Sequence, residues 1–343
     1  MPRKTKTSRI VYPELWDKVS KENKDLLDDF MDYCRSINRS KTTIDGYYND
    51  IQICWVWNLQ HNKNKFFVDF TKRDVIKYQN WLVTEQELSS NRVRRLRSAL
   101  SSLSNYIESI LDDTYSDFRP IINKIPAPPK QDVRDKTVLE DEQVDYLLKH
   151  LVDNDKYQQA CAVALAVSSG SRKSELLRFK TSYFTEDNII YGALYKTPEK
   201  IKTKGRGSGK FIYRYIIVKT FKPYFDLWMQ QREEWGIEGE ELFWSKQKGV
   251  WVPAGISLLN SWALSFSKIL DVHWYWHLNR HYFTTMLCKA NIPAEVIKDI
   301  IGWESVDLIS LYNDQSVDDE LGKYFDKDGI KQVERGLLED LTK

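Results

Sequence analysis

The stretch HLNRHYFTTMLCKANIPAEVIKDIIGWESVDLISLYND, residues 277–314, holds most of the candidate chemistry in this sequence. It begins with a His, an Arg and a second His, and it ends just after a Tyr that follows a short apolar run. Apolar residues recur at helical spacing and predict helices over residues 277–290, 294–301 and 306–313. Three interpretations of these side chains are open at this point. They form one active site, they bind a metal, or they only belong to well-packed helices.

The segments before this stretch predict a mostly helical second half of the chain. TVLEDEQVDYLLKHL, YQQACAVALAVSSG, FKPYFDLWMQQREEW and SLLNSWALSFSKIL have the apolar spacing of helices. NIIYGAL and GKFIYRYIIV are rich in β-branched and aromatic residues, which predicts strands joined by a Gly-rich basic connection. The tail DDELGKYFDKDGIKQVERGLLEDLTK predicts one more helix. The expected fold class is mainly α with a small antiparallel β-sheet.

The first half of the chain predicts a separate helical domain. Residues 24–112 read as four helices, of which NRVRRLRSALSSLSNYIESIL has the clearest apolar stripe. Its first turns place Arg92, Arg94 and Arg95 off that stripe, facing outward. Such a cluster suits phosphate contacts, although a solvated helix face is the alternative. Four prolines without hydrophobic periodicity then predict an extended linker and a domain boundary over residues 119–136.

Composition excludes several classes of protein. The 343 residues carry a formal net charge of only +2, but the basic residues gather in patches, which suits binding of a polyanion on one face. The four Cys residues lie far apart among apolar residues and indicate buried thiols rather than a zinc or disulfide framework. No apolar run reaches the roughly 18 residues of a membrane helix, and no signal peptide is present. We therefore expect a cytoplasmic protein without a membrane partner.

Residue patterns leave two kinds of site to consider. The sequence has no P-loop, no dinucleotide glycine fingerprint and no G-x-S-x-G elbow. His273, His277 and His281 recur every four residues, a spacing at which imidazoles on a helix can share a metal. No Asp or Glu lies among them, so a metal site is the less favoured interpretation. Arg280 and Arg172, the latter just after a helix-breaking Gly, are candidates for binding an anion.

Three segments resemble, in order, the signature boxes of the tyrosine site-specific recombinases, the phage integrase family. SSGSRKSELLRF resembles the first box, and HLNRH resembles the second, H-x-x-R. IIGWESVDLISLY resembles the terminal box, with Trp303 nine residues before Tyr312 and 23 residues after Arg280. The resemblance covers nearly the whole chain and fits the simple two-domain type that includes the Cre and Xer recombinases.

The resemblance implies an enzyme that breaks and rejoins DNA strands without metal, cofactor or ATP. It assigns the catalytic positions Arg172, Glu175, Lys204, His277, Arg280, Trp303 and Tyr312. Tyr312 would attack the scissile phosphate, clamped by Arg172 and Arg280, and form a 3′-phosphotyrosyl link. His277 would accept or tune the proton, with Glu175 as its orienting partner.

General chemistry agrees with these roles. Arginine keeps its charge and offers a planar fork of donors to two phosphate oxygens. A phenol with an ordinary pKa of about 10 needs a positive field and a proton acceptor to become a nucleophile. The leaving 5′-oxygen needs a proton donor, which in the family is a lysine of a small β-hairpin. Lys204, just before the Gly-rich turn, is our choice, and Lys202 is the alternative.

The sequence departs from the family pattern at three positions. Trp303 stands where most members have His, and its indole N–H can donate one hydrogen bond but cannot shuttle protons at neutral pH. Ser171 and Asn279 replace the usual Leu before each arginine, which puts packing rather than catalysis in question. Contacts to DNA are predicted for Lys41, Thr42, Arg92, Arg94, Arg95, Arg206 and Lys210.

By resemblance, the two domains form a C-shaped clamp on DNA. A basic extension (1–22) precedes a helical, SAM-like core-binding domain (23–118). The linker (119–136) leads to a mixed α/β catalytic domain (137–317). A C-terminal helix (318–343) docks on a neighbouring subunit.

The expected partners are double-stranded DNA with a specific core site, a homotetramer on two duplexes, and an optional accessory DNA-bending or directionality factor. The short N-terminal segment predicts that there is no arm-binding domain, and we expect a prokaryotic or phage origin. The competing functions are a type IB-like topoisomerase, a non-catalytic DNA-binding protein of the same fold and a metal-dependent nuclease. Integration, excision and resolution stay open as the biological task.

Overall fold

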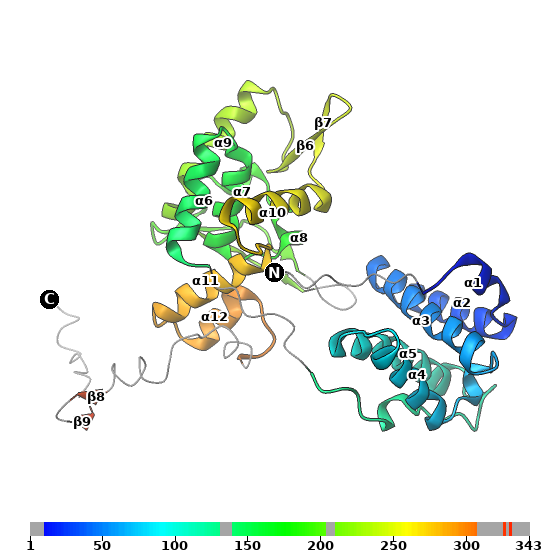
Figure 1. Cartoon of the computed structure of the whole chain (residues 1–343). Helices are drawn as coiled ribbons and strands as arrows, with labels where there is room; N and C mark the ends of the chain where they lie inside the picture. The colour runs from blue at the N-terminus through cyan, green and yellow to red at the C-terminus, as the bar shows by residue number, and fades with distance from the viewer. Residues whose placement is uncertain (1–9, 131–138, 204–209, 307–324, 327–328, 331–343) are drawn as a thin grey trace. The chain divides into compact units, whose positions relative to one another are not determined.

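The computed structural model describes residues 10–130, 139–203, 210–306, 325–326 and 329–330. Contacts divide the chain into an N-terminal unit (Met1–Lys136) and a C-terminal unit (Thr137–Lys204 and Lys210–Lys343), both drawn in Figure 1. Both units are mainly helical, and the C-terminal unit adds short antiparallel strands, which confirms the predicted fold class. No helix in the described ranges is long and apolar enough to cross a membrane.

Helices make up the described part of the N-terminal unit. They are α1 (Pro13–Lys18), α2 (Lys21–Ser36), α3 (Lys41–His61), α4 (Lys72–Thr84) and α5 (Ser90–Ile110), with 3₁₀ turns η1 (Phe67–Asp69) and η2 (Ile122–Lys124). The four longer helices confirm the prediction from apolar periodicity. Helix α1 was not predicted, because its six residues are too few to show a period, and it packs on α3. Ser40 and Ser89 cap α3 and α5 with their hydroxyl oxygens.

Aromatic side chains contribute several contacts to the core of the N-terminal unit. Trp55 of α3 packs on Phe67 with ring centroids 5.0 Å apart, and Trp57 lies 5.1 Å from Tyr78 of α4. The Trp55 indole donates to Asn23 O at 3.0 Å, so its burial leaves that N–H paired. Helix α5 adds its apolar stripe to this core and keeps the arginines of its first turns on the opposite face.

The first part of the predicted linker is bound to the N-terminal unit. Arg97, buried in α5, donates through Nη2 to Ile122 O at 2.6 Å and to Ile125 O at 2.5 Å. Arg94 Nη1 donates to Pro128 O at 2.8 Å. These hydrogen bonds anchor the described linker residues along α5. The guanidinium groups thus supply hydrogen-bond donors to backbone carbonyls of the linker.

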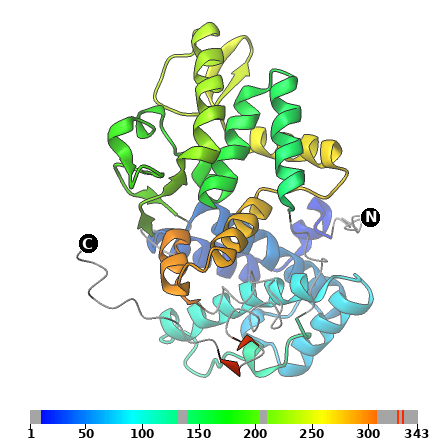
Figure 2. The ribbon, with the colours of Figure 1, turned by 90° about the vertical axis from the view of Figure 1, so that its left-hand side faces the viewer.

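Helix α7 is the centre of the C-terminal unit. The helices are α6 (Asp141–Asp153), α7 (Tyr157–Ser169), α8 (Lys173–Leu176), α9 (Val218–Glu234), α10 (Ile256–Leu270), α11 (His277–Lys289) and α12 (Ala294–Ile301). The sequence of α7 is apolar on all sides, and it is buried from Ala160 to Ser169. Helices α6, α9 and α11 pack against it, and Figure 2 shows the helices of this unit gathered together.

The strands of the C-terminal unit are short and antiparallel. A three-stranded sheet has the order β1 (Ile189–Ile190), β2 (Leu194–Lys196) and β5 (Tyr215–Ile217). A hairpin pairs β3 (Ile201–Lys202) with β4 (Phe211–Ile212), and the separate hairpin of β6 (Trp244–Gln247) and β7 (Val250–Pro253) was not predicted. Its turn uses Lys248 and Gly249 at φ of +49° and +87°, a conformation typical of tight hairpins but without the Asn-Gly signature.

The C-terminal segment differs from its prediction where it is described. The sequence predicted a helix from residue 318 onward, but β8 (Phe325–Asp326) pairs with β9 (Gly329–Ile330) in an antiparallel hairpin. Gly329 disfavours a continuous helix at this point. The remaining residues of this segment, and the helix predicted over 306–313 from residue 307 onward, lie outside the described residues.

Candidate active site

Glycine ends two helices directly before predicted catalytic residues. Gly170 follows α7 at φ of +58°, and a Cβ there would lie 2.6 Å from Phe283 Cδ1. Gly302 follows α12 at φ of +78°, where a Cβ would approach the Cδ1 methyl of Ile212. Only glycine suits such left-handed, close-packed helix ends. The two turns place Arg172 at the N-cap of α8 and Trp303 directly after the Gly302 cap of α12.

We expect Gly302→Ala to lower the free energy of unfolding by about 2 kcal/mol. An alanine at this position would have to adopt a positive φ. Its Cβ would lie 2.5 Å from Ile212 Cδ1. Gly236→Ala is the matched control, because Gly236 has φ of +60° but nothing within 4 Å of its Cβ position. Urea unfolding should show the larger loss for Gly302→Ala, and equal losses in both variants would contradict the role of crowding.

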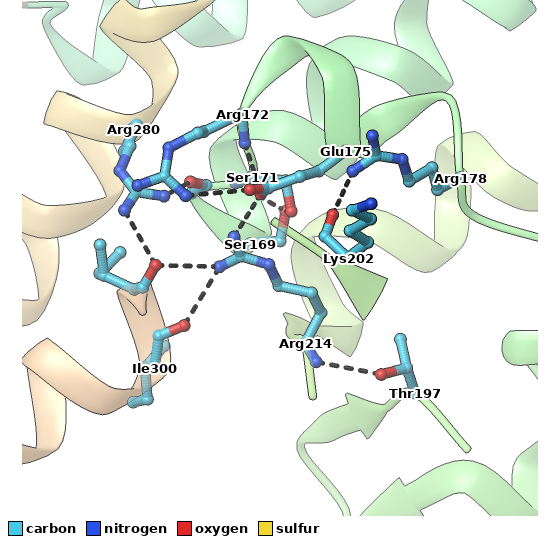
Figure 3. Close-up of polar contacts among 12 residues, drawn as sticks. Ser169, Ser171, Arg172, Glu175, Arg178, Thr197, Lys202, Arg214, Arg280 and Ile300 are labelled. Atoms are coloured by element: carbon cyan, nitrogen blue, oxygen red, sulfur yellow. Dashed lines mark hydrogen bonds and ion pairs between the residues drawn. The ribbon is translucent and has the colours of Figure 1, made fainter. Parts of the chain in front are cut away.

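Arg280 joins the two glycine turns (Figure 3). It is fully buried in α11, where Nη1 donates to Gly170 O at 3.0 Å and Nη2 donates to Ile301 O at 2.8 Å. Its guanidinium carbon lies 5.7 Å from the centroid of the Trp303 ring, within cation–π range. The residues of the first, second and terminal boxes therefore meet in one packed cluster.

Glu175 is fully buried, and arginines hold its carboxylate. Oε1 accepts from Arg172 Nη1 at 3.0 Å, and Oε2 accepts from the Arg172 backbone N–H at 2.9 Å. Arg214 Nη2 also donates to Oε2. Burial acts to raise the pKa of Glu175, but Arg214 and Arg172 outweigh it and hold that pKa below its ordinary value. Both carboxylate oxygens accept hydrogen bonds from arginines. The role of Glu175 in orienting His277 stays a prediction.

Arg214 is the member of this cluster that sequence reasoning missed. It is fully buried, and its Nη1 donates to Ile300 O at 3.2 Å and to Ile301 O at 3.3 Å. The segment GKFIYRYIIV did contain a signal. Arg214 alternates with Ile212 and Ile216, so a period of two residues puts it on the same inward face as buried Ile216.

The departures Ser171 and Asn279 both occupy buried positions. Ser171 N donates to Ser169 Oγ at 3.3 Å, and the two hydroxyl oxygens lie 2.8 Å apart. Asn279 Nδ2 donates to Trp276 O at 3.3 Å, while its Oδ1 is buried without a hydrogen-bond partner among the described residues. Local hydrogen bonds thus replace the apolar packing that Leu would provide.

His277 is the first residue of α11, and its ring centroid lies 5.0 Å from that of His281. Partial burial of the ring, followed by His281, Arg280 and Arg172, lowers the pKa of His277 to about 4. The three neighbouring basic groups disfavour the charge of the protonated ring. The imidazole is therefore neutral at pH 7 and can accept a proton.

We expect the contribution of His277 to stability to fall between about pH 6.5 and pH 4. In this window the unfolded chain protonates His277 at its ordinary pKa of 6.5, whereas the folded chain, with a pKa of about 4, does not. Acid therefore favours the unfolded state, and this loss is complete below about pH 4. Urea unfolding across the window should show a shallower fall for His277→Gln. Identical slopes for the variant and the parent protein would contradict the lowered pKa.

The three histidines do not share one helix face. His273 precedes α11, and its ring packs on Tyr275 with centroids 5.5 Å apart. Only His277 and His281 lie on the helix at the predicted spacing. Within the described ranges, no three His, Cys, Asp or Glu side chains come together in a way that could hold a metal ion.

The β3–β4 hairpin lies beside the cluster. Lys202 is exposed in β3, and its carbonyl accepts from Arg178. Lys210 was predicted to contact DNA, and its Nζ donates to Trp303 O at 3.2 Å, which links the hairpin to the terminal box. Outside the described residues lie three of the predicted positions, Lys204, Arg206 and Tyr312.

Asp50 holds two of the predicted DNA-binding arginines of the N-terminal unit. Its buried carboxylate accepts from Arg92 Nη1 at 2.6 Å and from Arg95 Nε at 3.2 Å. The side chains of Arg92 and Arg95 remain 34% and 65% exposed, respectively. The carboxylate thus fixes two guanidinium groups on an open face without removing either from solvent.

The start of α3 forms a second basic region of the N-terminal unit. Lys41 and Thr42 are exposed there. Lys41 lines a pocket of about 450 Å³ together with Arg35, Arg39 and the carboxylate of Asp45. Positive side chains beside a helix N-terminus favour an anion such as a phosphate.

Two segments of the chain match known families. Residues 26–117 match the phage integrase, N-terminal SAM-like domain, and residues 137–318 match the phage integrase family. A curated relative is the SPbeta prophage-derived recombinase-like protein YomM of Bacillus subtilis (strain 168). It is 28% identical over 306 residues, which cover 88% of this chain and 86% of YomM.

Solved structures share the fold. XerH site-specific recombinase bound to palindromic difH substrate has a TM-score of 0.64 at 17% identity, covering 87% of this chain and 82% of XerH. A lambda integrase dimer bound to a COC′ core site has a TM-score of 0.61 at 17% identity, with 90% and 99% covered. Tn1549 transposon integrase with circular intermediate DNA reaches 0.59 at 15% identity, with 87% and 98% covered. The chain belongs to the phage integrase family of tyrosine recombinases.

Proposed function

We propose that this tyrosine recombinase cleaves and rejoins DNA at a specific core site through a 3′-phosphotyrosyl intermediate on Tyr312. The observation that carries the proposal is the cluster of Arg172 and Arg280, which hydrogen bonds hold on adjoining turns. Two fixed guanidinium groups can bind both non-bridging oxygens of one phosphate. They stabilise the charge that develops on those oxygens in the transition state.

In the proposed cleavage step, the Tyr312 oxygen bonds to phosphorus as the bond to the 5′-oxygen breaks. Neutral His277 accepts the phenolic proton, and Lys204, or alternatively Lys202, protonates the leaving 5′-oxygen. The Trp303 indole donates to a phosphate oxygen. Attack by a 5′-hydroxyl of a second strand then reverses the step and releases the tyrosine. Because the covalent link conserves the bond energy, no ATP is consumed.

The proposal extends to domains and assembly. Residues 23–118 bind DNA, residues 119–136 connect the domains, residues 137–317 carry the chemistry, and residues 318–343 dock on a neighbouring subunit. The complex is a homotetramer on two DNA duplexes in the cytoplasm, with an accessory DNA-bending or directionality factor where the site requires one. The lambda integrase dimer on its core site and the similarity to a prophage-derived protein support a mobile-element recombinase.

Covalent capture on nicked DNA tests the proposed function. The protein is incubated in EDTA with nicked duplexes from the sequence flanking its gene, so that the short cleaved strand diffuses away and the intermediate accumulates. We expect an adduct whose peptide contains Tyr312. Adducts on many unrelated sequences would favour a type IB-like topoisomerase. Specific binding without any adduct would favour a non-catalytic DNA-binding protein.

The double variant Arg92→Ala/Arg94→Ala is expected to bind DNA more weakly. The slope of log K against log[salt] should become shallower by about 2, because binding neutralises two fewer phosphates and so releases fewer counterions. Binding is measured at several salt concentrations. Arg119→Ala is the control, because Arg119 is exposed in the same unit but lies outside α5. An unchanged slope in the double variant would show that this face of α5 does not contact phosphates.

A further inference from the structure

Arg214 connects the two halves of the candidate active site, although it belongs to no signature box (Figure 3). Its Nη2 pairs with Glu175, which holds Arg172. Its Nη1 donates at 3.3 Å to Ile301 O, the carbonyl that also accepts from Arg280 at 2.8 Å. A continuous path of polar contacts therefore runs from the first catalytic arginine to the second.

The path closes into a ring. Arg280 Nη1 donates to Gly170 O, and Gly170 lies two residues before Arg172 in the chain. The backbone of Arg214 is fixed as well, since its N–H donates to Thr197 Oγ1 and its carbonyl accepts from Thr197 N, both at 3.0 Å. Such a ring holds two phosphate-binding groups in one geometry, which reduces the reorganisation required in the transition state.

The charges in the ring indicate what Arg214 contributes. Without Arg214, the buried carboxylate of Glu175 would face Arg172 alone and cancel the charge that a phosphate requires. With Arg214 present, two guanidinium groups pair with the one carboxylate, so one net positive charge remains for the phosphate. A buried ion pair is by itself weak support for stability, and Arg214 Nε is buried without a hydrogen-bond partner among the described residues. Fold stability alone therefore explains this residue poorly.

We propose that Arg214 is a positioning residue for strand cleavage. It neutralises Glu175, so that Arg172 presents its full positive charge to the scissile phosphate. Through Ile301 O, it also couples the position of Arg172 to that of Arg280. Arg214 acts through these groups and does not touch the substrate. The inference rests on the proposed recombinase activity and adds a determinant outside the signature boxes.

Single-turnover cleavage of prebound nicked DNA tests this role at a temperature where circular dichroism shows each variant folded. We expect Arg214→Met to cleave about 100-fold more slowly, the loss typical of one electrostatic donor. Adding Glu175→Gln should restore about tenfold of that rate, because the uncompensated carboxylate is removed. Arg214→Lys keeps the charge and should stay within about tenfold of the parent protein.

A second substrate separates charge from packing. Replacing one non-bridging oxygen of the scissile phosphate by a methyl group makes that phosphate neutral. The deficit of Arg214→Met should then shrink to less than about tenfold, because less charge develops on the phosphate. The control is Arg232→Met. Arg232 is a buried arginine that binds carbonyls after α9, so its loss should lower stability without slowing cleavage by folded protein.

Three results would overturn the inference: normal cleavage by Arg214→Met, an equal deficit on both DNAs, or no gain from adding Glu175→Gln. If Arg214→Met does not fold, Arg214→Lys and the double variant are compared on the two DNAs with the same criteria. An absent adduct with the parent protein would instead contradict the proposed function. An adduct that forms equally well without Arg214 would contradict only this inference.

Discussion

Tyr312→Phe is expected to abolish the covalent DNA adduct while leaving binding to the DNA site unchanged. Phe keeps the ring but has no oxygen that can attack phosphorus. Loss of the nucleophile should lower cleavage by about 10⁴-fold or more, because the remaining groups cannot form the intermediate. Denaturing gels of the nicked-duplex reaction measure the adduct, and gel-shift titration of the intact duplex measures binding.

Tyr324→Phe is the matched control for this prediction. Tyr324 is a second tyrosine near the end of the chain, twelve positions after Tyr312. We expect its variant to form the adduct at the rate of the parent protein. If Tyr312→Phe still forms the adduct and Tyr324→Phe does not, the nucleophile is Tyr324. The class of reaction would then stand while the site assignment would be wrong.

Arg172→Ala is expected to lower the cleavage rate by about 10³-fold or more. The substitution removes a fork of donors and one positive charge from the phosphate site, while Glu175 stays buried and negatively charged beside Arg214. DNA affinity should fall far less, because one phosphate contact is a small part of the binding free energy. Single-turnover cleavage and binding titrations therefore have to be measured on the same duplex.

Lys173→Ala is the control for Arg172→Ala. Lys173 begins α8 one residue later, and its amine donates to Asn260 Oδ1 at 2.7 Å. Its loss removes the same charge from the same turn, and we expect cleavage to stay within a few-fold of the parent rate. Arg172 is the better arginine for this experiment, because its side chain is 26% exposed whereas Arg280 is fully buried. Normal cleavage by Arg172→Ala would contradict the phosphate clamp.

The long helices could be predicted because their apolar stripes face one core at a regular period. Residues 24–112 and the segments around α7 show this period over many turns, so each local pattern agrees with the final packing. The β6–β7 hairpin has four-residue strands and a Lys248-Gly249 turn, and neither feature stands out in the sequence. Short strands carry too few alternating residues to show a period of two.

Contacts between distant positions were beyond sequence reasoning. Asp50 holds Arg92 over 42 residues, and Glu175 pairs with Arg214 over 39. Lys210 illustrates the same gap, because nothing in its sequence position indicates that its Nζ donates to Trp303 O. Local charge identifies a basic residue, but it does not say which carboxylate or carbonyl the fold brings within reach.

The sequence by itself determined the family, the helical class and the residues proposed for phosphoryl transfer. Phosphoryl transfer restricts the residue types that can perform it. In this chain those residue types stand at the intervals of the signature boxes, so they can be identified from the sequence before the fold is known. Only the tertiary structure decided that Arg172 and Arg280 share one ring of hydrogen bonds and that Arg214 completes it. Burial makes that decision, because an arginine removed from water has to find its partners wherever the packed chain supplies them.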